Sequence, residues 1–208
     1  MVSESLAQRA LPLVTFESAE IVGDYGQAVW DAGLRVIEVG FRTSEAPQAV
    51  SRMRSETQLT VVAGTLTSIK AVDQAIDAGA HWGIAPNYDS SVLDHAQARG
   101  FSLVPGIATP TELGDAVRRG LSYVKVYPVS ALGGIPYLSS LHAVFPDIHL
   151  IPSGGVALAL LPDYLSVRGV AAVSGSWLPS VPTEAETVDF VKIGDVITEL
   201  LSLVPEGP

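Results

Sequence analysis

The chain repeats one pattern, in which a helix-like stretch ends at a glycine and an apolar strand follows at once. The glycines are Gly33, Gly79, Gly100, Gly120 and Gly169, and the runs after them are LRVIEVG, AHWGIAP, FSLVPGI, LSYVKVYP and VAAVSGS. Glycine most readily adopts the left-handed conformation that ends a helix. The runs are continuously apolar, which is typical of parallel strands covered on both faces. The pattern therefore predicts a series of strand–helix units.

Extending this pattern along the chain predicts eight strands. We place them at 11–16, 35–41, 59–64, 81–86, 102–107, 123–128, 149–154 and 170–176. Helical patterns lie between the strands, for instance SIKAVDQAIDAG and TPTELGDAVRRG. In the second of these, Thr109 or Thr111 is the candidate N-cap, with Glu112 in the first turn.

Eight strand–helix units predict a (β/α)8 TIM barrel, which occupies residues 1–208 as a single compact domain. The alternative is a doubly wound open sheet, because it has the same local pattern. A last helix is expected at 184–203, with apolar positions at Val188, Val191, Val196, Leu200 and Leu201. In a barrel, catalytic groups come from the C-terminal ends of the strands, and a phosphate often lies after strands seven and eight.

Composition excludes several classes of function. The sequence has no cysteine, so it lacks disulfides, thiolate nucleophiles and cysteine-ligated metals, and this suits a reducing cytoplasm. A net charge of −10 argues against nucleic acid and anionic membranes as partners. We see no signal peptide or membrane-spanning run, and we expect a cytoplasmic protein. No pair of histidines has metal-ligand spacing, so no metal is expected.

Lys125 stands at the centre of an apolar strand, SYVKVYP. A charged amine is costly there, because burial disfavours the ionised form. The other two lysines, Lys70 and Lys192, fall on helices and are interpreted as solvated. Lys125 either extends from the strand end to solvent or is a neutral amine that attacks a carbonyl. Its position alone supports both hypotheses equally.

The strand RVIEVGFRT carries two charges on one face, because Glu38, Gly40 and Arg42 are spaced by two residues. One interpretation is a buried structural ion pair. The other makes Glu38 a proton shuttle and Arg42 a clamp for a carboxylate, which its guanidinium can bind through two parallel hydrogen bonds. The candidate lysine nucleophile on the same interior favours the second interpretation.

Three turns that follow strands are candidate binding elements. In VVAGTLTS, the simplest reading of Gly64-Thr65 is an ordinary turn in which Thr65 or Thr67 caps the next helix. The turns in IPSGGVA and VSGSWLP expose backbone N–H groups before possible helix starts, and such groups bind anions. The residues concerned are Gly154, Gly155, Gly175 and Ser176.

Five motifs, in order and with sensible spacing, resemble the class I 2-keto-3-deoxy-6-phosphogluconate (KDPG) aldolases and their 4-hydroxy-2-oxoglutarate (KHG) and phosphogalactonate relatives. They are VIEVGFRT, VAGTLTS, IAPN, VKVYP with its following GG, and IPSGGV, followed by SGSWL, and they span about residues 11 to 178. The resemblance implies a TIM barrel, usually a homotrimer, that needs no cofactor. It also implies reversible cleavage of a 2-keto-3-deoxy-4-hydroxy acid to pyruvate and an aldehyde.

The resemblance implies a role for each candidate residue. Lys125 would form the Schiff base, and Glu38 would move protons. The other substrate-binding residues would be Arg42 and Thr65 at the pyruvate carboxylate, and Pro86, Tyr127 and Ser153 around the pocket. The residues implied at the phosphate are Gly154, Gly155, Gly175 and Ser176.

Some positions depart from the pattern common in the family. Gly40 stands where threonine is frequent, Ser153 keeps the hydroxyl of a frequent threonine, and Asn87 after Pro86 resembles the phosphogalactonate branch. We expect KDPG as the substrate and glyceraldehyde 3-phosphate as the aldehyde product. The alternatives are 2-keto-3-deoxy-6-phosphogalactonate or 4-hydroxy-2-oxoglutarate as substrate and, from another class, a non-catalytic anion-binding or structural barrel.

Overall fold

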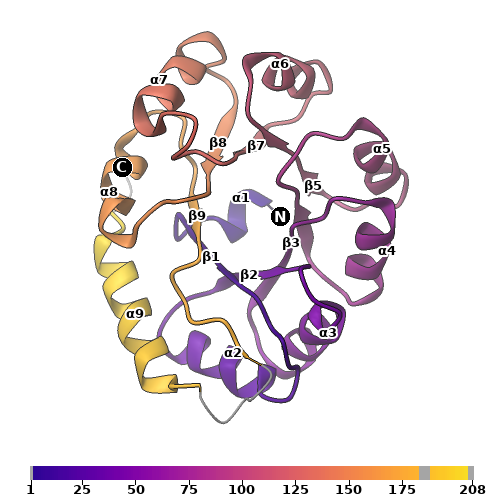
Figure 1. Ribbon diagram of the computed structural model, residues 1–208, viewed down its shortest axis with the longest axis vertical. Coiled ribbons are helices and arrows are strands. Elements are labelled where there is room, and N and C mark those ends of the chain that lie inside the picture. Colours follow the sequence, from indigo (N-terminus) through magenta and orange to yellow (C-terminus); the bar gives the residue numbers. More distant parts are fainter. Residues whose placement is uncertain (1, 183–187, 206–208) are drawn as a thin grey trace.

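Parallel strands surrounded by helices make up an α/β fold (Figure 1). The computed structural model describes residues 2–182 and 188–205. The strands in these residues are β1 (Ala10–Val14), β2 (Val36–Gly40), β3 (Thr60–Gly64), β4 (Trp82–Ile84), β5 (Leu103–Val104), β6 (Gly106–Ile107), β7 (Tyr123–Val126), β8 (His149–Pro152) and β9 (Val173–Gly175). They form a curled six-stranded sheet in the order β5-β4-β3-β2-β1-β9 and a three-stranded sheet in the order β6-β7-β8.

Helices alternate with the strands along the chain and pack around them. Their bounds are α1 (Val2–Ser5), α2 (Val22–Asp31), α3 (Ala46–Glu56), α4 (Ile69–Asp77), α5 (Ser90–Ala98), α6 (Pro110–Arg118), α7 (Gly134–Val144), the 3-10 turn η1 (Leu158–Leu160), α8 (Leu161–Ser166) and α9 (Phe190–Leu203). The five glycines of the repeating pattern all have positive φ, between 68° and 98°. The predicted strand–helix alternation is therefore confirmed.

Two helix starts are determined by hydroxyl side chains. Thr109, and not Thr111, caps α6: its Oγ1 accepts a hydrogen bond from the Glu112 N–H, and the Glu112 carboxylate accepts one from the Thr109 N–H. This reciprocal pair is a capping box. The cap of α4 is Ser68, whose Oγ accepts from the Ala71 N–H. The interpretation of Thr65 or Thr67 as that cap is therefore wrong, and the Thr65 hydroxyl instead accepts a hydrogen bond from Arg42 Nε.

The strand expected at 102–107 is divided in two, and this is the largest difference from the predicted strands. Pro105 separates β5, which pairs with β4, from β6, which pairs with β7. Proline has no N–H to donate to a neighbouring strand, so it interrupts a ladder. Its carbonyl nevertheless accepts a hydrogen bond of 2.8 Å from the Lys125 N–H.

The order of the strands follows the order of the chain, except that the last strand, β9, pairs with the first, β1. A doubly wound sheet reverses its order at a switch point, and the sheet seen here has no such reversal among the described residues. Two isolated parallel bridges, Leu150↔Val170 and Ser153↔Ser174, connect the segments of β8 and β9. The single eight-stranded sheet expected from the sequence therefore appears as two sheets joined at these points.

Apolar side chains fill the space on both sides of the strands. The larger cluster lies between the strands and the surrounding helices. The inner cluster lies within the ring of strands, and its buried members are Leu6, Leu11, Val36, Val62, Trp82, Ile84, Val104, Ile151 and Ala172. Figure 1 shows α1 across the middle of this ring, where the Trp82 indole N–H donates to Ser5 Oγ at 3.0 Å. One end of the ring is therefore closed by apolar packing.

The last helix differs from the prediction in its start and in its buried face. α9 begins at Phe190 after the Asp189 cap, whereas the start expected at 184 lies outside the described residues. Its buried residues are Ile193, Ile197 and Leu200, which share one helical face, while Val191 is 74% exposed. The apolar positions named from the sequence therefore include the exposed Val191 and omit the buried Ile193 and Ile197. Every helix in the described part of the chain is too short or too polar to cross a bilayer.

Candidate active site

Lys125 and Glu38 contact each other inside the ring of strands. Lys125 comes from β7 and Glu38 from β2, and the Lys125 Nζ lies 3.2 Å from Glu38 Oε1. Their side chains are 5% and 0% exposed, so the hypothesis that Lys125 extends to bulk solvent is wrong. A buried amine paired with a carboxylate matches the requirement for a nucleophile with an adjacent acid–base group.

Two serines complete the buried polar group. Ser174 Oγ donates to Glu38 Oε2 at 2.8 Å, and Ser153 Oγ lies 3.4 Å from Ser174 Oγ. Glu38, Lys125, Ser153 and Ser174 are the buried polar and charged residues recorded for 2–182 and 188–205, and all four converge here. The buried polar side chains of the described residues thus form one hydrogen-bonded cluster.

Ser174 was missed by sequence reasoning. A signal for it exists: Ala172 belongs to the inner apolar cluster, and Ser174, two residues later in the same extended segment, points to the same side. In the sequence, however, this serine stands next to Gly175, so VSGS is most simply interpreted as the start of a turn.

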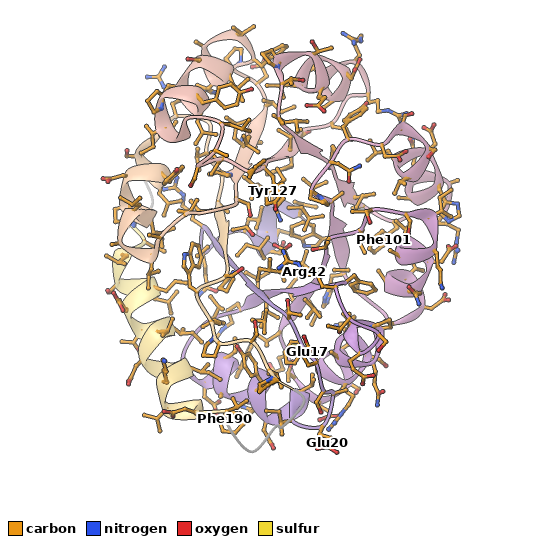
Figure 2. The ribbon with its side chains drawn as sticks, in the orientation of Figure 1. Glu17, Glu20, Arg42, Phe101, Tyr127 and Phe190 are labelled. Carbon is orange, nitrogen blue, oxygen red and sulfur yellow. The ribbon has the colours of Figure 1, made fainter. Side chains whose placement is uncertain are left out.

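A cavity of about 560 Å³ opens beside this group. Its lining includes every predicted site residue except Glu38, which is fully buried and contacts the lining residue Lys125. The lining residues are Leu13, Arg42, Thr65, Pro86, Lys125, Tyr127, Ser153, Gly154, Gly155, Val156, Gly175 and Ser176. Figure 2 shows Arg42 and Tyr127 near the middle of the ring of helices. The structure therefore brings together residues that are up to 163 positions apart in the chain, from Leu13 to Ser176.

Arg42 and Thr65 form the cationic wall of the cavity. Arg42 follows β2 and Thr65 follows β3, and these strands pair in register at Gly40 and Gly64. Arg42 Nε donates to Thr65 Oγ1 at 3.4 Å. Thr65 has a φ of +62°, which is rare for a β-branched residue and is the kind of backbone strain found at functional sites. An exposed guanidinium beside a threonine hydroxyl suits a carboxylate ligand.

The two glycine turns form the opposite wall. Gly154 and Gly155 have φ values of +91° and +80°, and a Cβ on Gly154 would lie 2.9 Å from Pro128 Cα. Only glycine fits that position without backbone movement. The Trp177 indole N–H donates to the Val156 carbonyl at 2.9 Å, so it joins the second turn to the first.

The helical segment expected after the first turn is present but short: η1 begins at Leu158 and continues into the six-residue α8. After the second turn, no helix begins between Ser176 and Phe190 among the described residues. The tryptophan and the isolated bridges hold the chain in an extended path there instead. Any anion bound at these turns therefore depends on backbone N–H groups of the turns themselves.

Within the described ranges, no group of three or more His, Asp or Glu side chains could hold a metal ion.

Comparison with known proteins places this geometry in a family. A family model described as KDPG and KHG aldolase matches residues 3–196. The chain belongs to this aldolase family. It is therefore a carbon–carbon lyase, and the resemblance of its five motifs is confirmed.

Individual aldolases agree over nearly the whole chain. The 2-dehydro-3-deoxy-phosphogluconate aldolase of Treponema pallidum is 32% identical over 198 residues, which are 94% of this chain and 93% of that protein. The KDPG aldolase of Zymomonas mobilis, solved with 3-phosphoglycerate, has a TM-score of 0.88 at 29% identity, with 97% and 95% of the two chains covered. The Legionella pneumophila KDPG aldolase, with pyruvate captured as a covalent carbinolamine, has a TM-score of 0.86 at 29% identity and coverages of 99% and 98%.

Proposed function

We propose that this aldolase cleaves KDPG to pyruvate and glyceraldehyde 3-phosphate through a Schiff base on Lys125. The observation that carries the proposal is the buried contact of 3.2 Å between Lys125 Nζ and Glu38 Oε1 beside the cavity. The names of the relatives support the substrate, and the carbinolamine in the Legionella enzyme supports the covalent route.

Lys125 and Glu38 would share the chemical steps. The neutral amine of Lys125 attacks C2 of the keto acid, and loss of water from the carbinolamine leaves a protonated imine. Glu38 then accepts the proton of the C4 hydroxyl, the C3–C4 bond breaks, and its electron pair moves into the enamine. The aldehyde leaves, the enamine is protonated at C3, and water releases pyruvate from the lysine. The imine acts as the electron sink that makes this bond weak enough to break.

The walls of the cavity would orient the substrate around that imine. Arg42 and Thr65 hold the carboxylate of the pyruvate half, with Pro86 and Tyr127 along its sides. Such positioning of the carbonyl near the amine contributes several kcal/mol to catalysis, on the order of 7 or more in well-oriented reactions. At the other end, backbone N–H groups of the glycine turns and Ser176 hold the phosphate of the aldehyde half.

The proposal also covers the closure of the barrel, the oligomeric state and the location of the protein. The two sheets close into one (β/α)8 barrel, supported by β5 and β6 flanking Pro105 and by the bridges between the β8 and β9 segments. The family resemblance supports a homotrimer, and the absence of cysteine suits a cytoplasmic location. 2-Keto-3-deoxy-6-phosphogalactonate remains an alternative substrate, because Asn87 follows Pro86 of the cavity lining as in the phosphogalactonate branch. 4-Hydroxy-2-oxoglutarate is the other alternative, supported by relatives named KHG/KDPG aldolase.

Reductive trapping tests the proposal directly. The protein is incubated with pyruvate and borohydride, and the intact mass and the modified peptide are determined. We expect a single adduct on Lys125, and none in Lys125→Met. Lys70→Met, which removes an exposed lysine at the start of α4, is the matched control and should label like the wild type. A wild-type protein that gives no adduct would favour the non-catalytic barrel. Cleavage rates with the three candidate substrates then decide among them.

A further inference from the structure

We propose that Ser174 is a positioning residue that holds the Glu38 carboxylate against Lys125 throughout the reaction. The inference rests on the proposed function and adds a residue to it. Glu38 is held at both oxygens: Lys125 Nζ lies 3.2 Å from Oε1 and Ser174 Oγ donates to Oε2 at 2.8 Å. Lys125 and Ser174 are the side chains that donate to Glu38 in the described part of the chain.

The carboxylate of a glutamate needs such an anchor. Rotation about its last torsion is broad, so the two oxygens have no fixed direction of their own. On one side Glu38 faces Gly64, which has no side chain to hold it. A hydrogen bond to Oε2 from the opposite direction therefore determines which oxygen faces the lysine.

Ser174 is itself rigidly held. It is fully buried, its backbone pairs with Leu11 of β1, and an isolated bridge pairs it with Ser153. A serine hydroxyl has one proton to donate. Because Ser174 gives that proton to Glu38, the 3.4 Å contact between the two serines runs from Ser153 to Ser174. The hydroxyls thus form a chain that begins at the cavity wall and ends at the carboxylate.

The reaction removes the other anchor. The free amine has two N–H donors, whereas the protonated imine on the same nitrogen has one. Once Lys125 is bonded to the keto acid, its contribution to holding Glu38 falls, at the stage when Glu38 must accept the C4 proton. Ser174 is not consumed by any step, so it keeps Oε1 directed at the reacting atoms.

The inference differs from a purely structural role for a buried hydroxyl in what it predicts. Hydrogen bonds to charged groups are worth more than neutral ones, so Ser174→Ala should lower kcat about ten- to a hundredfold while KM changes less than about threefold. A hydroxyl that donates to a carboxylate also favours its charged form. The acidic limb of the pH–rate profile should therefore move to higher pH in Ser174→Ala.

The experiment compares three proteins: wild type, Ser174→Ala and Ser174→Thr, which keeps the hydroxyl. Measured for each are kcat, KM, the pH profile of kcat/KM, the rate of borohydride trapping with pyruvate, and the thermal midpoint. We expect slow trapping and the displaced pH limb in Ser174→Ala, with most of the wild-type behaviour restored in Ser174→Thr. If Ser174→Ala fails to fold, Ser174→Cys replaces it as a variant of similar volume with a weak donor.

Each outcome decides the inference. Wild-type kcat and pH profile in folded Ser174→Ala overturn it and leave the Schiff-base proposal standing. Equal losses in Ser174→Ala and Ser174→Thr, with the pH limb unmoved, also overturn it, because packing and not the hydroxyl then matters. A wild-type protein that traps no pyruvate overturns the proposed function, and this inference with it.

Discussion

The carboxylate of Glu38 occupies the space in which a side chain on Gly64 would lie. A Cβ on Gly64 would be 2.3 Å from Glu38 Oε1 and 2.8 Å from its Cδ. The two residues are on neighbouring strands, where Glu38 pairs with Val62 and Gly40 with Gly64. Glycine is therefore required at position 64 by its neighbour across the sheet.

Gly64→Ala should inactivate the enzyme more than it destabilises it. The new methyl group displaces a flexible side chain, so we expect the free energy of unfolding to fall by about 1 to 3 kcal/mol. The displaced carboxylate no longer meets Lys125, so kcat should fall by about tenfold or more. Steady-state kinetics and urea denaturation measure the two effects. Undiminished kcat would show that Glu38 works from another position.

Gly106→Ala should destabilise the protein more than it inactivates the enzyme. A Cβ there would lie 2.1 Å from the Pro86 carbonyl carbon and 2.6 Å from the Asn87 nitrogen, and both are backbone atoms. We expect a loss of about 3 kcal/mol in unfolding free energy. Gly194→Ala is the matched control, because nothing lies within 4 Å of its Cβ and it stands inside α9. It should gain about 0.5 to 1 kcal/mol. A Gly106→Ala protein as stable as this control would contradict the prediction.

Arg42→Lys should weaken binding of the keto acid. A lysine keeps the charge but loses the planar fork that makes two parallel hydrogen bonds to a carboxylate. We expect KM for the cleaved substrate, and the pyruvate concentration for half-maximal trapping, to rise about tenfold. Arg168→Lys, at an exposed position outside the cavity, serves as the control. Equal KM values in Arg42→Lys and Arg168→Lys would show that Arg42 does not bind the substrate carboxylate.

His81 should make the protein less stable in acid. Burial, and then the neighbouring positive charge of Arg54, lower the pKa of His81 from its usual 6.5. The folded ring therefore stays neutral at a pH where the unfolded chain is protonated. Its contribution to stability is complete above about pH 6.5 and is lost as the pH falls through the lowered folded value.

Comparison of wild type with His81→Asn checks this sign. Asparagine can replace Nδ1, which accepts from the Val61 N–H at 2.9 Å, but it does not titrate. The unfolding free energy of the wild type minus that of His81→Asn should fall from pH 8 to pH 5. If this value instead rises toward acid pH, the pKa of His81 is raised and not lowered by folding. Arg54→Gln removes one of the two causes of the lowered pKa of His81, so stability should depend less on pH in this variant.

Sequence reasoning succeeded where a residue contradicts its surroundings. Lys125 and Glu38 are charges inside apolar strands, and the strand–helix pattern brings the ends of those strands together, so their meeting could be predicted. Ser174 and Gly64 are ordinary residues for a turn, and their importance comes from neighbours across the sheet. The break at Pro105 has a local cause, the missing N–H of proline, that could have been recognised in the sequence. The extended path after Ser176 depends on tertiary contacts, such as the hydrogen bond from Trp177 to the Val156 carbonyl, which local patterns do not contain.

The apolar cluster that α1 covers lies on one side of Lys125, and the cavity lies on another. Tyr123, two residues before Lys125, packs against that cluster, and Lys125 itself lines the cavity. In the proposed reaction, pyruvate stays bonded to Lys125 after the C3–C4 bond breaks, whereas the aldehyde fragment is not bonded to the protein. In cleavage the aldehyde must depart first, and in synthesis the keto acid must arrive first. Pyruvate should then inhibit competitively against the cleaved substrate and the aldehyde non-competitively. A compulsory order of release thus follows from the place of Lys125 in the cavity wall, where it keeps the pyruvate half bonded until the aldehyde has left.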